Sequence, residues 1–253
     1  MAPGSLVFED VALCYRLAKQ RIPSFKDYAL HWMRGALSYE QLWALRGVSF
    51  SIAPGERVGV VGRNGAGKST LLKVAARVLK PHQGRARVEG RVAPILELGT
   101  GFDFELTGLE NIYLNGLLMG RTRREIAAEV DAIVDFSGLG DFVISPVRNY
   151  SSGMLARLGF AIVTAWRPDV LILDEFLAVG DAAFLRKCQA RLERFWDAGT
   201  TLLLVSHVAD AVRASCRRCL WIEQGALRAD GPTEDVLERY LAAEDSGEIR
   251  PHA

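Results

Sequence analysis

The sequence predicts an α/β protein with a mainly parallel sheet and helices on the faces of that sheet. Continuous apolar runs at residues 57–61, 170–173 and 201–205 have the length and composition of buried parallel strands. Helices are predicted at 68–79, after the first run, and at 182–196, between the last two. Strands that alternate with helices in this way form parallel sheets covered by helices.

Weaker sequence patterns predict the secondary structure of the rest of the chain. Residues 6–11, 48–52 and 220–222 are predicted strands, and further short strands are expected up to residue 98. From 107 to 166 the pattern is mostly helical, most clearly at 123–136 and 154–166, and a last helix is expected at 236–242. The helix at 68–79 is expected to stop there because Lys80 and Pro81 follow.

One segment, at about residues 16–41, interrupts the strand-rich beginning of the chain. It is rich in basic and aromatic residues, and Ser24 with Asp27 has the spacing of a capping box. Apolar residues then recur at helical spacing, at Phe25, Tyr28, Ala29, Trp32 and Met33. A short amphipathic helix is predicted, which either packs on its own domain or contacts a partner or a membrane.

Composition narrows the class of protein. The 253 residues are 49% apolar and 24% charged, which is ordinary for a globular protein. The net charge of +1 argues against a main task of binding nucleic acid. No apolar run approaches the roughly 18–20 residues that cross a bilayer, and the start does not resemble a secretory signal. The chain is expected to stay in the cytoplasm.

Four cysteines are present: Cys14, Cys188, Cys216 and Cys219. The last two have metal-knuckle spacing, but no second pair completes four ligands. Reduced, partly buried thiols are therefore predicted rather than a metal or redox site.

Residues 62–69, Gly-Arg-Asn-Gly-Ala-Gly-Lys-Ser, fit the pattern G-x-x-x-x-G-K-[ST] between a predicted strand and a predicted helix. Glycines let the backbone N–H groups converge on phosphate oxygens, and the helix points its positive end at the same anion. Lys68 is expected to neutralise the outer phosphates, and Ser69 is expected to offer its hydroxyl to magnesium. The sequence therefore predicts a loop that binds ATP.

Two carboxylates, Asp174 and Glu175, follow the predicted strand 170–173. This is the edge of an open α/β sheet at which ligands bind. Asp174 is expected in the shell around magnesium, and Glu175 is expected to polarise the attacking water.

Three further motifs carry a resemblance to the ATP-binding-cassette (ABC) ATPases. Residues 150–154, Tyr-Ser-Ser-Gly-Met, lie between the phosphate loop and the acidic strand and look like the signature of that family, Leu-Ser-Gly-Gly-Gln. Residues 179–181, Val-Gly-Asp, resemble its dimer-contact loop, and Ser206 with His207 resembles its switch histidine. The order and spacing agree, so the resemblance covers nearly the whole chain.

The resemblance implies a P-loop NTPase core with a mainly parallel sheet, an N-terminal antiparallel β subdomain and an inserted α-helical subdomain. The ATPase domain is expected at 1–245, with the amphipathic insert at about 16–41, the helical subdomain at about 107–166, and a short tail at 246–253.

The resemblance also implies that two copies sandwich two ATP molecules head to tail. The signature of one copy then contacts the γ-phosphate held by the other, and His207 touches the same phosphate. The nucleotide-binding residues carried over are Gly62, Arg63, Asn64, Gly65, Ala66, Gly67, Lys68, Ser69, Thr70, Ser151, Ser152, Gly153 and Asp181.

Some positions depart from the usual family pattern. Ser152 replaces the first glycine of the signature, and Met154 replaces its glutamine. Glu97 lies nearest to the position of a glutamine in the mobile loop of the family, and it is expected to hydrogen-bond to a metal-bound water. Tyr15 is expected to stack on adenine, with Trp43 as the alternative, and either residue can instead belong to the core.

The departures point to a subgroup of the family. Four segments resemble the ATPase subunits of bacterial polysaccharide exporters: residues 96–102, 106–111, 150–154 and 177–182. That resemblance implies two copies bound to a separate membrane-spanning permease on the cytoplasmic face of the inner membrane. Lipid-linked O-antigen, capsule or teichoic acid is the implied cargo. A C-terminal carbohydrate-binding domain, present in some members, is expected to be absent or removed. The alternatives are a soluble, non-transport ABC ATPase and the ATPase of an importer.

Overall fold

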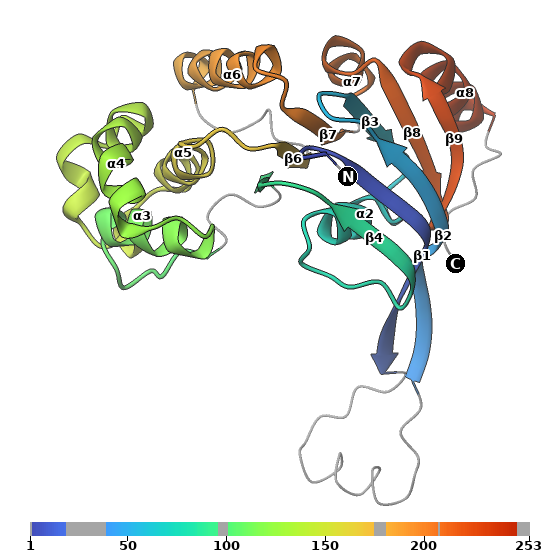
Figure 1. The fold of residues 1–253 in the computed structure, drawn as a ribbon, viewed down its shortest axis with the longest axis horizontal. Helices are drawn as coiled ribbons and strands as arrows, with labels where there is room; N and C mark the ends of the chain where they lie inside the picture. The colour runs from blue at the N-terminus through green and yellow to red at the C-terminus, as the bar shows by residue number, and fades with distance from the viewer. Residues whose placement is uncertain (1, 19–38, 96–100, 175–180, 207, 247–253) are drawn as a thin grey trace, which may run out of the picture.

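The computed structural model describes residues 2–18, 39–95, 101–174, 181–206 and 208–246. Within them, the chain forms two sheets and a separate group of helices (Figure 1). The larger sheet has the order β5-β6-β7-β3-β8-β9, and all its neighbouring pairs are parallel except β8 with β9. The predicted mainly parallel sheet is therefore confirmed. Its strands are β3 (Arg57–Val61), β5 (Val92–Ile95), β6 (Val170–Asp174), β7 (Thr201–Val205), β8 (Arg218–Glu223) and β9 (Ala226–Pro232).

The smaller sheet is antiparallel, in the order β2-β1-β4. Its strands are β1 (Leu6–Ala18), β2 (Tyr39–Ile52) and β4 (Gln83–Val88). β1 and β2 are longer than the predicted strands because both ends of the predicted insert pair with each other, for example Arg16 with Gln41. The predicted helix within residues 24–34 lies outside the described residues.

Helix α2 (Lys68–Ala75) ends earlier than the predicted residue 79. The prediction took Lys80 and Pro81 as the stop signal, but Arg77 already has a left-handed backbone with φ of 62°. The N–H groups of Val78 and Leu79 both bond to the carbonyl of Lys73. A left-handed residue after the last turn closes a helix in this way and satisfies its final carbonyls.

Successive side chains along the central strands point to opposite faces of the larger sheet. On one face, Leu203 and Val205 join the core that holds α2 between the two sheets (Figure 1). On the other face, Leu202 and Leu204 join a second core with residues of the outer helices. These outer helices are α6 (Ala182–Asp197), α7 (Ala209–Ser215) and α8 (Thr233–Asp245). Neither α7 nor β9 was predicted from the sequence.

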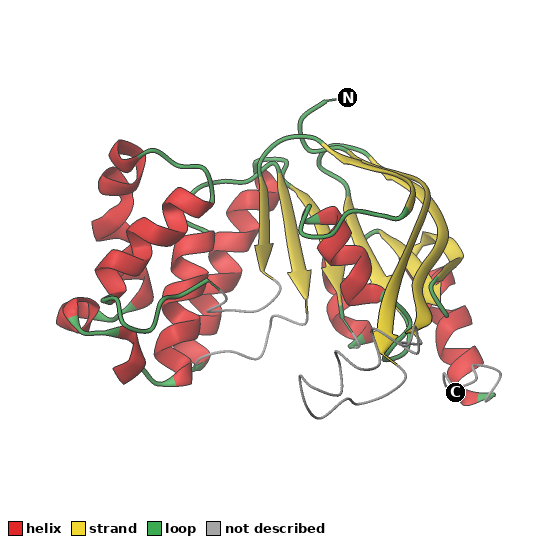
Figure 2. Cartoon of the chain, turned by 90° about the horizontal axis from the view of Figure 1, so that it is seen from below, coloured by secondary structure: helices red, strands yellow, loops and turns green. Residues whose placement is uncertain are grey.

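The predicted helical region from 107 to 166 is confirmed and forms a body to one side of the sheets (Figure 2). Capping boxes begin two of its helices, with Thr107 and Glu110 at α3 and with Thr122 and Glu125 at α4. The region has a core of its own, centred on residues such as Ile112. Its helices are α3 (Gly108–Leu118), α4 (Arg123–Ser137) and α5 (Ser152–Val163), with short 3-10 turns at Gly140–Ile144 and Val147–Asn149.

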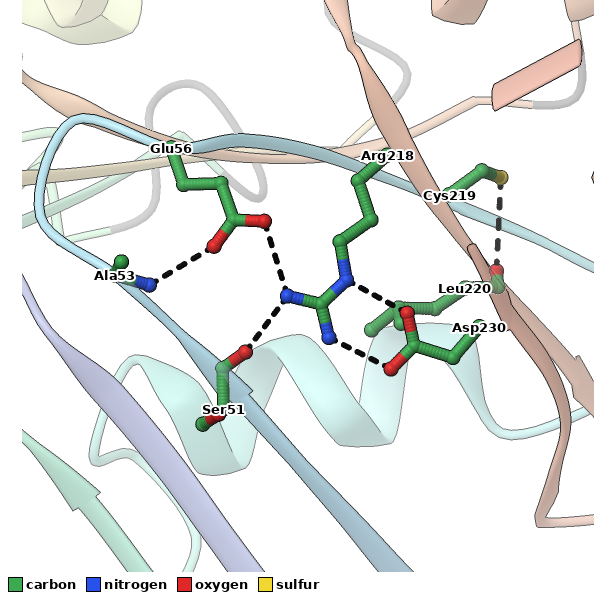
Figure 3. A network of polar contacts seen from close by, with 7 residues as sticks. All are labelled: Ser51, Ala53, Glu56, Arg218, Cys219, Leu220 and Asp230. Atoms are coloured by element: carbon green, nitrogen blue, oxygen red, sulfur yellow. Dashed lines mark hydrogen bonds and ion pairs between the residues drawn. The ribbon is translucent and has the colours of Figure 1, made fainter. Parts of the chain in front are cut away.

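A polar network joins the two sheets at the edge where the parallel strands begin (Figure 3). Arg218 forms two 2.6 Å hydrogen bonds to Asp230, and it also donates to Glu56 and to the carbonyl of Ser51, each at 2.9 Å. The hydrogen bonds to Asp230 raise the pKa of the Arg218 guanidinium. Because these partners lie on β2, β9 and the turn before β3, the network fixes the antiparallel sheet against the parallel one.

All four cysteines are buried, and none of them forms a disulfide. Burial raises the pKa of Cys188, Cys216 and Cys219 to about 12, so these thiols stay protonated at neutral pH. In the described part of the chain, no helix is long and apolar enough to cross a membrane.

Candidate nucleotide-binding site

The predicted phosphate loop connects β3 to α2, and two of its glycines are required by the surrounding structure. A side chain at Gly62 would place its Cβ 2.2 Å from the carbonyl oxygen of Ile222. At Gly67 it would lie 2.3 Å from the carbonyl oxygen of Ala44. Both glycines also have positive φ, 148° and 107°, which side chains disfavour. The tight curl of the loop is therefore imposed by strands β2 and β8 behind it.

Lys68 is the first residue of α2 and is only 7% exposed. Its Nζ donates to the carbonyl oxygens of Gly62 at 2.6 Å and of Arg63 at 2.9 Å. These bonds hold the ammonium group across the loop. A cation held there would be close to an anion bound by the loop.

The N-terminus of α2 also suits an anion. Its N-cap is Gly67, and no side chain caps it in the described structure, whereas Thr107 and Thr122 cap α3 and α4. First-turn N–H groups without a side-chain cap favour a negatively charged ligand, as does the positive end of the helix dipole. Ser69 is exposed in this first turn.

Asp174 ends β6, and strand register brings it to the same edge of the sheet as the loop. Asp174 pairs with Val205 of β7, and Val205 pairs with Val60 of β3. Gly62 and Ser206 follow those two strands, so all three positions lie along the carboxyl edge. Asp174 is half-buried, and its carboxylate and the hydroxyl of Ser69 are both oxygen ligands of the kind that Mg²⁺ prefers.

Three predicted site residues lie outside the described part of the chain: Glu97, Glu175 and His207. Ser206 and Val208, on either side of His207, are described. Ser206 is buried, and its hydroxyl accepts a hydrogen bond from the N–H of Val208 at 3.0 Å. The roles of Glu97, Glu175 and His207 therefore remain predictions.

Tyr15 lies beside α2, because its hydroxyl is 3.3 Å from the hydroxyl of Thr70. It is half-buried and packs against the core between the sheets. Trp43 is also half-buried, and it is paired with Cys14 in the strand register, whereas Tyr15 is paired with Leu42. Successive residues of a strand point to opposite faces, so Tyr15 and Trp43 are on different faces of the hairpin. The contact to Thr70 of α2 places Tyr15 by the loop.

The predicted signature begins α5, as expected from its pattern. Ser151 is the N-cap and accepts a hydrogen bond from the N–H of Met154 at 3.2 Å. Ser151 and Ser152 are exposed. In Figures 1 and 2, α5 lies with the helical body, whereas α2 lies between the sheets. The structure of one chain does not bring the signature and the phosphate loop into one site.

Asp181 caps α6 through the N–H of Phe184 at 2.8 Å, and it also pairs with Arg157 of α5. The N–H of Phe184 is the main reason that the pKa of Asp181 is lowered, and Arg157 adds to it. Sequence reasoning missed Arg157. Its only signal was an arginine on the helix that follows the signature, and no local pattern pairs it with Asp181.

The fold and the loop define a P-loop nucleotide-binding protein with an inserted helical body. The profile of the family described as ABC transporter matches residues 45–178. The chain belongs to the ABC transporter family, which confirms the predicted family and fold.

Known relatives agree with this assignment. The O-antigen export system ATP-binding protein RfbB of Klebsiella pneumoniae is 46% identical over 93% of this chain and 97% of that protein. The teichoic acids export ATP-binding protein TagH of Bacillus anthracis is 38% identical over 92% of this chain and 42% of that protein. The predicted resemblance to ATPases of polysaccharide exporters is confirmed by these matches.

A solved structure shares the fold. It is the dimeric, post-hydrolysis state of the ATP-binding cassette MJ0796, bound to ADP and Pi. It matches with a TM-score of 0.70 over 90% of this chain and 98% of that chain, at 19% identity.

Proposed function

We propose that this chain is the ATP-hydrolysing subunit of an exporter that moves lipid-linked polysaccharide across the cytoplasmic membrane. The observation that carries the proposal is a complete phosphate loop, with Lys68 held across it, in a chain 46% identical to an O-antigen export ATP-binding protein. The export function is named for that relative, and the similarity extends along nearly the whole of both chains.

In this proposal, the loop from Gly62 to Thr70 binds the phosphates of ATP and Tyr15 stacks on adenine. Ser69 and Asp174 would hold Mg²⁺, which would supply positive charge against the negative charge that develops in phosphoryl transfer. Glu97 would hydrogen-bond to a water on that ion. Glu175 takes the proton of the attacking water.

A second copy completes each site. Ser151, Ser152 and Gly153, with the positive end of α5, contact the γ-phosphate held by the other copy. Asp181 lies at the same dimer interface, and His207 reports the γ-phosphate. The exposure of Ser151 and Ser152 supports this arrangement, since an anion held by another chain can reach them.

The dimer would be peripheral to the membrane and bound to two membrane-spanning permease subunits. ATP closes the dimer, and hydrolysis with phosphate loss opens it, so the motion can drive transport. The segment from residue 24 to 34 contacts the permease or the lipid headgroups.

The variant Glu175→Gln tests the proposed chemistry. Loss of a general base lowers hydrolysis by about 100-fold or more, whereas ATP binding is retained. The variant is therefore expected to accumulate as an ATP-bound dimer, measured by gel filtration with and without ATP. Glu234→Gln, on the exposed surface of α8, is the matched control. Unimpaired hydrolysis by Glu175→Gln would refute the assigned base.

The export role has a separate test. Coexpressed with a candidate permease from its own source, the protein is expected to sediment with membranes. It is also expected to restore surface polysaccharide in cells that lack it. A chain that stays in the soluble fraction supports a non-transport ATPase instead, and a defect in uptake supports an importer.

A further inference from the structure

A pocket lies at the amino edge of the parallel sheet, at the end of β3 opposite the phosphate loop. Its volume is about 460 Å³, which is within the usual range for sites that bind small molecules. The turn before β3, the end of α6 and the residue before β8 form its walls. β3 has five residues, which at about 3.3 Å each put the phosphate loop roughly 16 Å from the pocket. The pocket is therefore separate from the candidate ATP site.

Two arginines lie side by side in this pocket. The N–H of Arg217 donates to the carbonyl of Arg57 at 3.2 Å, and the next residues along the two strands, Val58 and Arg218, are in register. Residues in register on neighbouring strands, about 4.8 Å apart, have their side chains on the same face of a sheet. Arg57 is also in register with Leu202, which belongs to the core of the outer helices. Both arginines are therefore on the face that α6 covers.

The charges of Arg57 and Arg217 are not neutralised by a neighbouring acid. In the part of the chain that the structure describes, neither arginine forms an ion pair. Glu56 also lines the pocket, but its carboxylate is already bonded (Figure 3). One oxygen accepts from Arg218 and the other from the N–H of Ala53, each at 2.9 Å. Two neighbouring cations are therefore left facing the pocket.

The last two residues of α6, Trp196 and Asp197, complete the pocket. The guanidinium carbon of Arg57 lies 5.8 Å from the ring centre of Trp196, and this contact uses none of its N–H donors. Trp196 is half-buried, so part of its ring forms an apolar wall. Asp197 is exposed and can accept hydrogen bonds from hydroxyl groups. The pocket thus combines two cations, an aromatic ring and a hydrogen-bond acceptor.

We propose that this pocket binds a phosphate monoester of a small hydroxylated molecule. A phosphate monoester carries a charge of about −1.5 to −2 at pH 7 and has three strong acceptor oxygens, which suits two guanidinium groups. A carboxylate, with a single charge, would leave one of the arginines unpaired. The hydroxyl groups of the ligand donate to Asp197, and its ring packs against Trp196. Sugar phosphates and nucleoside monophosphates share this chemistry.

Calorimetric titration of the whole chain tests the proposal with three probes: glucose 1-phosphate, AMP and inorganic phosphate. At least one of the two monoesters is expected to bind at one site per chain in a manner that depends on Arg217. The tighter of the two identifies the ligand as a sugar phosphate or a nucleotide. Inorganic phosphate should bind about tenfold more weakly, because it makes no contact with Trp196 and fewer hydrogen bonds in total.

Substitutions of the two arginines locate the binding. Arg217→Met should weaken binding of the monoester by about tenfold, because charge-assisted hydrogen bonds are lost. Arg57→Met together with Arg217→Met should weaken it by about 100-fold. Arg217→Lys keeps the charge without the planar fork, so a loss of about threefold is expected. The matched control is Arg228→Met, since Arg228 lies on β9 beside Glu223 and outside the pocket. Its affinity should equal that of the wild type.

The variant Asp197→Ala tests the contact with the hydroxyl groups. It should weaken binding of the monoester by about fivefold and leave binding of inorganic phosphate unchanged. Unfolding temperatures accompany every titration, because Arg57→Met also removes the contact with Trp196. If that variant unfolds, the variants of the exposed Arg217 carry the test alone.

Equal affinity of the wild type and Arg217→Met for the monoester would overturn the proposal. The absence of saturable binding of both monoesters at millimolar concentration would overturn it as well. Inorganic phosphate that binds as tightly as both monoesters would reduce the pocket to a simple anion contact, which also contradicts the proposal. These titrations need neither hydrolysis nor a second copy of the chain, so their failure would leave the proposed function untouched.

Discussion

Two glycines at two helix starts, Gly67 before α2 and Gly153 in the first turn of α5, serve different needs. A Cβ at Gly67 would lie 2.3 Å from the carbonyl of Ala44, so its own chain excludes a side chain there. Among the described residues, a Cβ at Gly153 would meet the hydroxyl of Ser151 alone, at 3.8 Å, which is ordinary contact. Packing within one chain therefore explains why residue 67 is glycine, but it does not explain why residue 153 is glycine.

The difference agrees with the proposed division of each ATP site between two chains. Glycine in a helix costs about 0.5–1 kcal/mol relative to alanine, so an unneeded glycine lowers stability. In the dimer that we propose, residue 153 is glycine because a phosphate held by the other copy approaches it closely. In that proposed dimer, the phosphate loop is the half of each site that a single chain completes, and the signature is the half that it offers to a partner.

The largest expected effect comes from Gly67→Ala. Side-chain strain at a left-handed residue costs about 1–3 kcal/mol, and here the carbonyl of Ala44 must also move. ATP affinity is expected to fall by roughly 100-fold, measured by calorimetric titration. Gly120→Ala is the control, because Gly120 also has positive φ but its Cβ would meet nothing within 4 Å. Equal affinities for Gly67→Ala and wild type would show that the loop tolerates a different curl.

A smaller effect of a different kind is expected from Gly153→Ala. The single chain should become slightly more stable, with a higher unfolding temperature, because alanine is the better helix former. ATP binding to the monomer should not change, but hydrolysis should fall by about tenfold as the methyl group holds the second copy off the γ-phosphate. If hydrolysis is unchanged, the signature does not approach a phosphate and the comparison of the two glycines fails.

The smallest effect is expected at the ring beside the loop. Stacking of a base on an aromatic side chain contributes about 1–3 kcal/mol, so Tyr15→Ala should weaken ATP binding by roughly tenfold. Tyr15→Phe keeps the ring and loses only the contact to Thr70, so it should bind ATP nearly as well as wild type. Trp43→Ala is the competing variant. A larger loss of affinity in Trp43→Ala than in Tyr15→Ala would move the stacking role to Trp43.

Predictions from the sequence were reliable where a pattern is local. The loop, the strand before it and the start of α2 at Lys68 were all predicted, because glycine spacing and apolar runs act within a few residues. The end of α2 was misplaced because the left-handed backbone of Arg77 has no strong sequence signal, whereas Pro81 has one. The long pairing of β1 with β2 was missed for a related reason, since pairing between distant segments leaves no local pattern.

The sequence by itself determined the class of this protein, the phosphate loop and the exporter relatives that it resembles. Those features depend on residue type and spacing, which are visible in one dimension. Only the tertiary structure decided that Ala44 and Ile222 exclude side chains from the loop, that Tyr15 lies beside Thr70, and that Arg157 holds Asp181. These contacts join residues from separate elements, and their distances arise only once the sheets and helices are packed together.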